Sequence, residues 1–397
     1  MKRVYIVTAI TSLLLLAASI LAFRSRGAGT DLDSLVVGFI YENDESTTYT
    51  YNFARSELVL EEQYPDLKIL SMSNVQDENT EEPLRELVRE GCNLIFTNGH
   101  SDVFLEAAKE FPGIQFCQVS YYHTELPEEL PENYHNFMGE SYQGRYLTGI
   151  IAGMKLRELI DNGELAPEEA LVGFVASFPY PEVISGYTAF LLGVRSVAPE
   201  AVMKVRYTYA WSNYNKEKAY AAELIKDGCV LLSQHTDTIG PAVACTEASG
   251  SRPVFHVGEN RSMFDVVPAG ELVACRTRWE TYVCGAVEAM LEGRRIEKTV
   301  PGNVYGTQDM SGGIAEGWIE LMGLNTNLCA EGTREKVEEA TAGLKKGKLQ
   351  VFKGDYTGVN PMDPTDTIDL RNGYRENQYS SYPSFHYVLD DVITIGE

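Results

Sequence analysis

Short β-branched apolar runs alternate with longer helical segments through most of the chain. The first series predicts strands near residues 36–41, 67–72, 93–97 and 114–119, and helices near residues 48–63, 80–90 and 101–110. The second series predicts strands near 171–177, 202–208, 229–234 and 253–257, and helices near 182–197, 215–226 and 238–249. Alternation of this kind is typical of doubly wound parallel sheets that helices cover on both faces. The pattern therefore predicts an α/β fold with two Rossmann-like lobes.

The two series are copies of one another. Residues 36–40 (VVGFI) reappear as residues 171–175 (LVGFV), and residues 90–95 (EGCNLI) reappear as residues 227–232 (DGCVLL). These landmarks keep an offset of about 135 residues, as two copies of one folding unit do. Two similar lobes imply a cleft between them.

The segments that follow each copy set the expected lobe boundaries. Residues 136–160 are predicted to finish lobe one with a strand and a long helix, because apolar positions between Tyr146 and Met154 recur at helical spacing. A strand at 272–275 and a helix at about 279–292 are expected to return to lobe one. Repeated crossovers of this kind predict a hinge between the lobes.

We therefore expect the following division of the chain: lobe one at 36–160 and 259–310, lobe two at 161–258 and 311–347, and a C-terminal tail of unassigned structure at 348–397.

The first thirty residues predict a membrane-directed segment. Residues 4–23 carry no charge, Lys2 and Arg3 precede them, and Arg24 and Arg26 follow. An apolar stretch of about 20 residues is long enough to enter a bilayer. Residues 1–30 are thus expected to be a signal peptide or an N-terminal membrane anchor, and the anchor is favoured because arginines stand where a cleavage site needs small neutral residues. The body of the protein is then expected outside the cytoplasm.

The charge of the chain narrows the class of ligand. The sequence has 57 acidic and 33 basic residues, which gives a formal net charge of −24. A field of this sign repels phosphate backbones, so nucleic acid is not an expected partner and a neutral or cationic small ligand is favoured. Surface acid of this kind also serves solubility alone in many globular proteins.

The loops after the predicted strands hold an unusual number of aromatic residues. In parallel α/β sheets, ligands bind at these strand ends. The aromatic candidates are Tyr49, Tyr51, Phe178, Tyr180, Trp211 and Tyr214, and the polar candidates are Asn98, Asp237, Glu259 and Asn260. Flat rings with a few directed polar groups suit a planar heterocycle or a sugar ring. Each residue also has a structural alternative: an aromatic ring can cover the core, and Asp237 can equally cap a helix.

Motifs for catalysis and for metal or cofactor binding are absent from the sequence. It contains no G-x-S-x-G elbow, P-loop, H-E-x-x-H or dinucleotide G-x-G-x-x-G. The seven cysteines form no C-x-x-C or Cys/His cluster, and Cys92 and Cys229 are expected to pack at equivalent strand starts. The sequence does not decide whether Cys275 and Cys284 form a disulfide. We therefore expect a binding protein without a cofactor, and not an enzyme.

Several longer motifs resemble one known family. These are residues 142–153 (YQGRYLTGIIAG), residues 172–184 (VGFVASFPYPEVI), residues 234–237 (QHTD) and residues 279–282 (WETY). Over roughly residues 36–325 the chain resembles the basic membrane protein family, the purine-nucleoside-receptor type of substrate-binding protein that serves ABC transporters. The resemblance implies a type I periplasmic-binding-protein fold, a purine base or nucleoside held between aromatic rings in the cleft, and ABC permease subunits as partners.

The resemblance also implies site residues. Tyr49 and Thr50 stand where this branch of the family has G-W-T-Y, and Trp211, His235, Asp237 and Trp279 match cleft motifs. The family segment G-Y-D-S-D-M reads GENRSM here, at residues 258–263. The acid that reads the base is then Glu259 or is missing, and Arg261 introduces a cation. A membrane-anchored sensor that uses the same cleft is the alternative function.

Overall fold

The computed structural model describes residues 29–119, 130–248 and 253–396. The predicted membrane segment at residues 4–23 lies outside the described residues. Within the described ranges, no helix combines the length and the apolar character that a membrane crossing requires.

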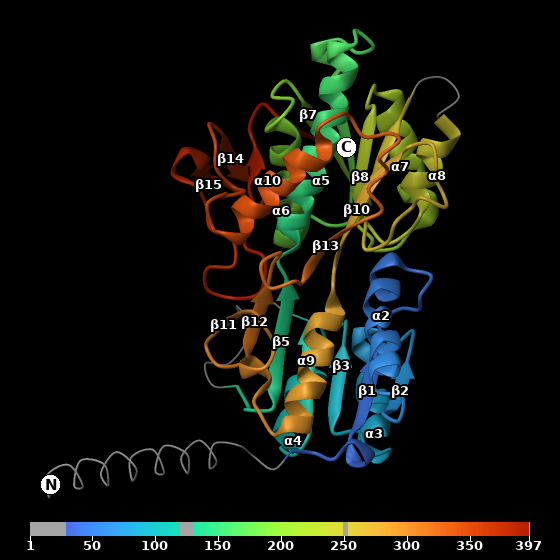
Figure 1. Cartoon of the computed structure of the whole chain (residues 1–397), viewed down its shortest axis with the longest axis vertical. Helices are drawn as coiled ribbons and strands as arrows, with labels where there is room; N and C mark the ends of the chain where they lie inside the picture. Colours follow the sequence, from blue (N-terminus) through green and yellow to red (C-terminus); the bar gives the residue numbers. More distant parts are fainter. Residues whose placement is uncertain (1–28, 120–129, 249–252, 397) are drawn as a thin grey trace, which may run out of the picture.

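The first lobe is built on a sheet with the strand order β11-β12-β5-β4-β3-β1-β2 (Figure 1). Its strands are β1 (Val36–Ile40), β2 (Lys68–Met72), β3 (Leu94–Thr97), β4 (Gln115–Val119), β5 (Tyr134–Gly139), β11 (Asn303–Tyr305) and β12 (Asp309–Gly312). The connecting helices are α2 (Thr48–Gln63), α3 (Glu81–Arg89) and α4 (Val103–Glu110). The central strands β1 and β3 are buried on both faces, which explains their continuous apolar runs.

The second lobe is built on a sheet with the order β13-β10-β9-β8-β6-β7-β17. Its strands are β6 (Leu171–Ala176), β7 (Val202–Tyr207), β8 (Leu231–His235), β9 (Phe255–Glu259), β10 (Glu271–Thr277), β13 (Ile319–Met322) and β17 (Ile393–Gly396). Its helices include α6 (Pro181–Arg195), α7 (Tyr214–Lys226), α8 (Gly240–Ala248) and α10 (Thr333–Lys345). The order β2-β1-β3-β4-β5 of the first sheet recurs as β7-β6-β8-β9-β10, which confirms the duplication predicted from the sequence.

Short 3-10 helices lie in the connections: η1 (Leu32–Ser34), η2 (Asp77–Asn79), η4 (Pro167–Glu169), η5 (Ile296–Lys298) and η6 (Leu370–Asn372).

The duplication extends to single core contacts. A Cβ on Gly38 would lie 3.2 Å from the Cys92 sulfur, and a Cβ on the equivalent Gly173 would lie 3.3 Å from Cβ of Cys229. Both thiols are buried, so the predicted packing role of these cysteines is confirmed. Cys275 and Cys284 do not form a disulfide.

In each lobe, the helix that follows the last parallel strand packs against the other lobe. β5 of the first sheet runs into α5 (Ser141–Asp161), which packs against α6 of the second lobe. β10 of the second sheet runs into α9 (Trp279–Glu292), which packs against α2 of the first lobe. Figure 1 shows α5 in the upper lobe and α9 in the lower one. The chain crosses once more between β12 and β13, so three crossovers join the lobes in the described part of the molecule.

Glycines allow α5 to approach α6 closely. A Cβ on Gly149 would collide with the backbone oxygen of Phe190, and a Cβ on Gly193 would collide with that of Tyr146. Small residues at a helix crossing let the two backbones come together. The YQGRYLTGIIAG string is therefore the surface by which α5 docks on the second lobe.

The predicted lobe boundaries differ from the structure at these crossovers. The helix expected to finish lobe one at residue 160 packs on lobe two, and the strand at 271–277, expected in lobe one, pairs with β9 in the second sheet. β12 lies across the expected boundary at 310 and 311, and it pairs with β5 in the first sheet. An apolar run shows that a strand is buried but does not show which sheet it joins.

The C-terminal tail, whose structure was unassigned, belongs mainly to the second lobe. β14 (Thr357–Asn360), β15 (Asp363–Asp369) and β16 (Val388–Leu389) form a small antiparallel sheet, and β17 pairs in parallel with β7. The tail also touches the first lobe, because the N–H of Ser381 donates to Asp309 Oδ2 of β12 at 2.9 Å. It therefore adds a further link between the lobes.

Phe385 anchors this tail and provides a test of its role. Its side chain is 0% exposed and stacks on Phe352 with a centroid distance of 4.3 Å. We predict that Phe385→Ala lowers the free energy of unfolding by about 3–5 kcal/mol, as measured by urea denaturation, because it opens a cavity in the core of the second lobe. Tyr379→Ala is the control, since Tyr379 is 84% exposed in the same tail. Equal unfolding midpoints for the two variants would show that the tail is not part of this core.

Candidate functional site

A cavity of about 120 Å³ lies between the lobes. Its lining residues come from the carboxyl ends of the strands in both sheets and from the two crossovers that lead into α5 and α9: Glu42, Tyr49, Asp77, His100, Val119, Met138, Ser141, Glu182, Trp211, His235, Asp237, Glu259, Asn260, Thr277 and Trp279. Parallel α/β sheets place their ligand sites at these ends, because the loops diverge there. Pockets that hold drug-sized ligands span about 300–1,000 Å³, so this cavity suits a compact ligand.

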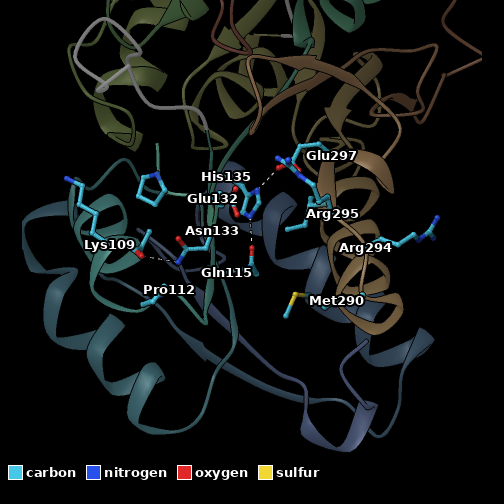
Figure 2. A pocket seen from close by; sticks show the side chains of 14 residues that line it. Lys109, Pro112, Gln115, Glu132, Asn133, His135, Met290, Arg294, Arg295 and Glu297 are labelled. Atoms are coloured by element: carbon cyan, nitrogen blue, oxygen red, sulfur yellow. Dashed lines mark hydrogen bonds and ion pairs between the residues drawn. The ribbon is translucent and has the colours of Figure 1, made fainter. Parts of the chain in front are cut away.

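A larger hollow of about 780 Å³ lies at the opposite end of the first lobe (Figure 2). Its walls include the starts of β4 and β5 and the end of α9. The buried His135 is already held there, with Nδ1 2.5 Å from Glu297 Oε1 and Nε2 2.8 Å from Gln115 Oε1. This hollow is distant from the converging strand ends, and its central polar groups are paired within the protein.

Aromatic side chains enter the interlobe cavity from both lobes. Tyr49 lies on α2 of the first lobe, and Trp211 follows β7 of the second. Trp279 is fixed in place because it is 2% exposed and packs against Phe53 at a centroid distance of 5.4 Å. Its ring also meets Tyr49 edge to face at 6.2 Å. The partly exposed Tyr49 and Trp211 are therefore the rings best placed to meet a ligand.

Carboxyl groups dominate the polar lining. Among the described residues these are Glu42, Asp77, Glu182, Asp237 and Glu259. Burial raises the pKa of Glu42 and of Glu182 to about 7. Burial, together with the nearby carboxyl groups of Glu217 and Glu42, raises the pKa of Asp237 well above its usual range. A cavity of this composition disfavours anions and offers oxygen acceptors to N–H and O–H groups.

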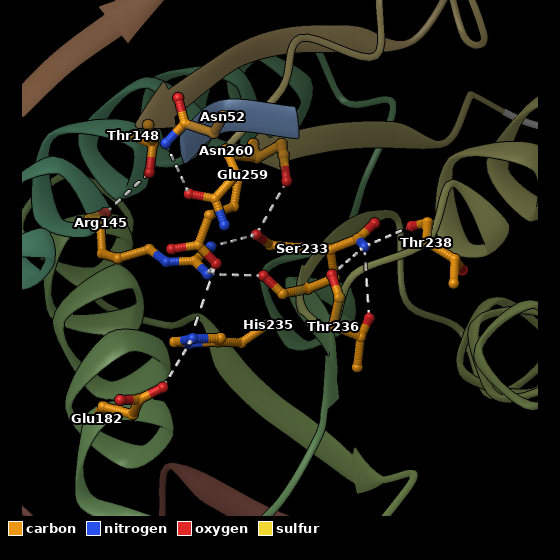
Figure 3. Close-up of polar contacts among 12 residues, drawn as sticks. Asn52, Arg145, Thr148, Glu182, Ser233, His235, Thr236, Thr238, Glu259 and Asn260 are labelled. Carbon is orange, nitrogen blue, oxygen red and sulfur yellow. Dashed lines mark hydrogen bonds and ion pairs between the residues drawn. The ribbon is translucent and has the colours of Figure 1, made fainter. Parts of the chain in front are cut away.

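A buried arginine sits behind these carboxyl groups (Figure 3). Arg145 on α5 is 0% exposed and forms an ion pair with Glu259 at the end of β9. It also donates to the backbone oxygen of Gln234 at 2.8 Å and lies 5.5 Å from the centroid of the Phe174 ring. Burial lowers the pKa of Arg145 to about 10, so the guanidinium stays charged at neutral pH. Arg145 thus holds the Glu259 carboxylate in place from a buried position outside the cavity lining.

His235 lies between two of the acids. Its Nε2 is 3.7 Å from Glu182 Oε1, and its Nδ1 is 3.9 Å from Glu259 Oε2. Burial, together with the nearby charge of Arg145, lowers the pKa of His235 well below its usual range. The ring is therefore neutral at physiological pH and adds no positive charge to the cavity.

One buried donor in the lining has no partner in the part of the chain that the structure describes. Trp279 Nε1 is buried and makes no hydrogen bond. An indole N–H is a donor only, and leaving it unpaired is costly. A ligand that presents an acceptor at this wall would satisfy it.

The structure brings most of the sequence-predicted site residues to the cavity. Tyr49, Trp211, His235, Asp237, Glu259, Asn260 and Trp279 line it. Thr50, Asn98 and Phe178 do not. Asn98 Nδ2 donates to Thr50 Oγ1 at 3.2 Å, and Asn98 Oδ1 accepts from the N–H of Glu42 at 2.9 Å. These two residues support the loop that carries Glu42, while Phe178 packs behind Trp211 at 5.5 Å.

Sequence reasoning missed other lining residues for identifiable reasons. Glu42 and His100 lie in loops after predicted strands and Glu182 lies in the first turn of α6, but their side chains are common surface types and carry no special signal. Ser141 and Thr277 lie at the crossovers into α5 and α9. Those crossovers were assigned within lobe one, so neither position was expected to face the cleft.

No group of three or more His, Cys, Asp or Glu side chains is arranged to hold a metal ion within residues 29–119, 130–248 and 253–396.

Comparisons with known proteins agree with this geometry. A family model described as ABC transporter substrate-binding protein PnrA-like matches residues 32–343. A purine-binding protein of Brucella abortus (strain 2308) is 28% identical over 343 residues, which cover 85% of this chain and 88% of that protein. A putative ABC transporter glucose-binding protein of Haloferax volcanii is 29% identical over 236 residues, which cover 59% of this chain and 55% of that protein.

A solved structure shows the fold. The chain matches a solute-binding protein of an ABC transporter system from Aeropyrum pernix K1 with a TM-score of 0.61 at 16% identity, over 83% of this chain and 94% of that one. The predicted type I periplasmic-binding-protein fold is confirmed by this likeness and by the two duplicated sheets.

Removal of the buried cation tests its role at the site. We predict that Arg145→Met lowers the free energy of unfolding by about 3–5 kcal/mol in urea denaturation, because Glu259 is left buried without its partner. The double variant Arg145→Met, Glu259→Gln should recover part of this loss, since it removes the orphaned charge. A double variant that is less stable than Arg145→Met would contradict this account of the pair.

The raised pKa of Glu182 makes a second prediction. An acid whose pKa rises from 4.5 to about 7 on folding binds more protons in the folded state, so this group lowers the free energy of unfolding as pH increases across that window. We predict that Glu182→Gln loses less stability than the wild type between about pH 5 and about pH 8, measured by urea denaturation without ligand. Glu338→Gln, at an exposed position on α10, should keep the wild-type slope. An unchanged slope in Glu182→Gln would place this pKa near its ordinary value.

Proposed function

Because the chain belongs to the PnrA-like family of ABC transporter substrate-binding proteins, we propose that it captures a purine base or nucleoside in the interlobe cavity. On this proposal it works outside the cytoplasm and delivers the solute to an ABC permease. The membership confirms the resemblance inferred from the sequence motifs. A membrane anchor at residues 4–23 would keep the protein near that permease.

The observation that carries the proposal is the pairing of aromatic rings with carboxyl groups around one small cavity. Tyr49 and Trp211 come from opposite lobes, so closure brings both rings to the same ligand. Stacking of a nucleobase on an aromatic side chain contributes about 1–3 kcal/mol in nucleic-acid complexes. The carboxyl groups of Asp237 and Glu259 would accept hydrogen bonds from the N–H edge of the base, and Trp279 Nε1 would donate to a ring nitrogen or carbonyl oxygen.

Charge separates uncharged purines from their phosphorylated forms. No Lys or Arg is among the described residues that line the cavity. The buried cation Arg145 is engaged by Glu259. A phosphate group would meet carboxyl groups without a compensating donor, so nucleotides are expected to be rejected. The 28% identical relative from Brucella abortus, a purine-binding protein, also supports the proposal.

Binding without turnover is the expected chemistry. Ser141 is the one Ser or Cys in the described lining, and no hydrogen bond joins it to His235, whose pKa lies well below its usual range. The cavity is lined by carboxyl groups and aromatic rings. On this proposal it binds a solute and releases it chemically unchanged.

A sugar is the second candidate solute. The relative from Haloferax volcanii carries the description of a putative glucose-binding protein, and rings with carboxyl groups also suit a sugar. Glucose therefore belongs in the same assay as the purines.

The proposal is tested by thermal unfolding with adenine, adenosine, guanosine, inosine, adenosine monophosphate and glucose. We predict that at least one unphosphorylated purine raises the unfolding temperature and that the monophosphate does not. At a hundredfold excess over Kd, the stabilisation is about 2.7 kcal/mol. Trp211→Ala should remove most of the shift, because it deletes one stacking face, while it leaves unfolding cooperative. Stabilisation by glucose alone would replace the purine with the sugar, and no shift with any of them would defeat the ligand assignment.

A further inference from the structure

The two lobes touch each other beside the cavity through an arginine and a tyrosine. Arg261 follows β9 in the second lobe, and Tyr51 lies on α2 in the first lobe. The Arg261 Cζ atom is 4.9 Å from the centroid of the Tyr51 ring. This distance is well within the roughly 6 Å over which a guanidinium and an aromatic face attract each other.

The backbone around Asn260 directs Arg261 across the gap. Asn260 adopts a left-handed conformation with φ of 60°, which Asn tolerates better than most residues. Its N–H donates to the backbone oxygen of Cys275 at 2.8 Å, and the N–H of Arg261 donates to that of Glu259 at 2.6 Å. This tight turn comes directly after Glu259, which faces the cavity. Arg261 is not among the cavity-lining residues, so its charge lies outside the site.

Neighbouring polar groups close the same face. Asn52, the next residue on α2, donates through Nδ2 to Asn260 Oδ1 at 3.4 Å and to the backbone oxygen of Thr277 at 2.9 Å (Figure 3). The N–H of Thr48, at the start of α2, donates to the backbone oxygen of Asp237 at 2.9 Å. The first turns of α2 thus meet the second lobe along one line, and the Tyr51 contact lies on it.

The Arg261 side chain contacts an aromatic ring and forms no ion pair among the described residues. No ion pair joins it to a carboxylate in the described part of the chain, although the protein carries a strong excess of acid. Its guanidinium instead lies over the ring of Tyr51 in the other lobe. Both residues are half-buried, so the attraction is less screened by water than at a fully exposed site.

We propose that Tyr51 and Arg261 form a latch that holds the lobes closed over the bound solute. Neither residue lines the cavity, so both act as positioning residues. They stabilise the closed state and thereby lengthen the time for which the solute stays bound. The inference rests on the proposed function, because the latch acts on a cleft that binds a solute.

The latch should affect release more than capture. A solute enters the open fraction of the ligand-free protein, in which Tyr51 and Arg261 are apart, so loss of the contact enlarges that fraction and raises the association rate only modestly. Release requires the lobes to separate and the contact to break. From the usual strength of such contacts we expect loss of the latch to raise the dissociation rate roughly 2- to 30-fold.

The test uses stopped-flow kinetics with adenine. Tyr51→Ala and Arg261→Ala should each raise the dissociation rate with little change in the association rate. The double variant should show no further increase, because both changes remove the same contact. Tyr51→Phe is the matched control, since it keeps the aromatic face and should retain the wild-type rates. An unchanged dissociation rate in Tyr51→Ala, or effects of the two changes that multiply as for independent sites, would overturn the latch.

A second measurement without ligand separates the latch from the choice of solute. The radius of gyration of the ligand-free protein, measured by small-angle X-ray scattering, should increase in Tyr51→Ala and Arg261→Ala and stay unchanged in Tyr51→Phe. If adenine does not bind the wild type, a purine that stabilises it replaces adenine in the kinetic test. Failure of every purine to bind would count against the proposed solute, and the radius measurement would still decide the latch. Equal radii in the wild type and Tyr51→Ala would overturn it.

Discussion

The buried ion pair between Arg145 and Glu259 is the interaction on which the cleft depends. The cavity gathers five carboxyl groups from the two lobes, and the buried Glu259 carboxylate among them needs a cation as its partner. Arg145 supplies that cation from α5, beneath the cavity wall, and leaves no positive charge on its surface. A pair of this kind adds little net stability by itself, but removal of one partner is costly. The pair therefore leaves carboxyl acceptors facing the ligand and, in the described lining, no free cation to bind an anion.

The position of Arg145 also links the site to the crossovers between the lobes. Its helix begins where β5 of the first lobe ends, and it docks on α6 through Gly149 and Gly193. The equivalent crossover after β10 places α9, and with it Trp279, in the first lobe. Each lobe is therefore completed by a segment of the other, and the crossovers constrain how the lobes move. The tail adds the contact from Ser381 to Asp309 near one end of this arrangement, and the contact between Arg261 and Tyr51 lies where the cleft closes.

The repeated elements could be predicted from the sequence because their physics is local. β1 and β6 are short apolar runs buried on both faces, and α2 and α7 begin and end within a residue of their predicted bounds. The crossovers could not be predicted in the same way. The apolar pattern of β10 says that it is buried, but its pairing with β9 depends on contacts between distant segments. The tail was missed because strands such as β15 are polar and largely exposed, so they lack the hydrophobic alternation that marks a strand. The site follows the same division: strand-end aromatics such as Trp211 carry a signal, whereas Ser141 and Thr277 acquire their place only through the crossovers.

The central claim is that the two lobes close over a flat, uncharged solute. Mass spectrometry of the small molecule released on denaturation of the purified protein tests this claim most directly. The account predicts a purine base or nucleoside without phosphate, at up to one molecule per chain. Release of a phosphorylated or otherwise anionic compound in that stoichiometry would contradict it.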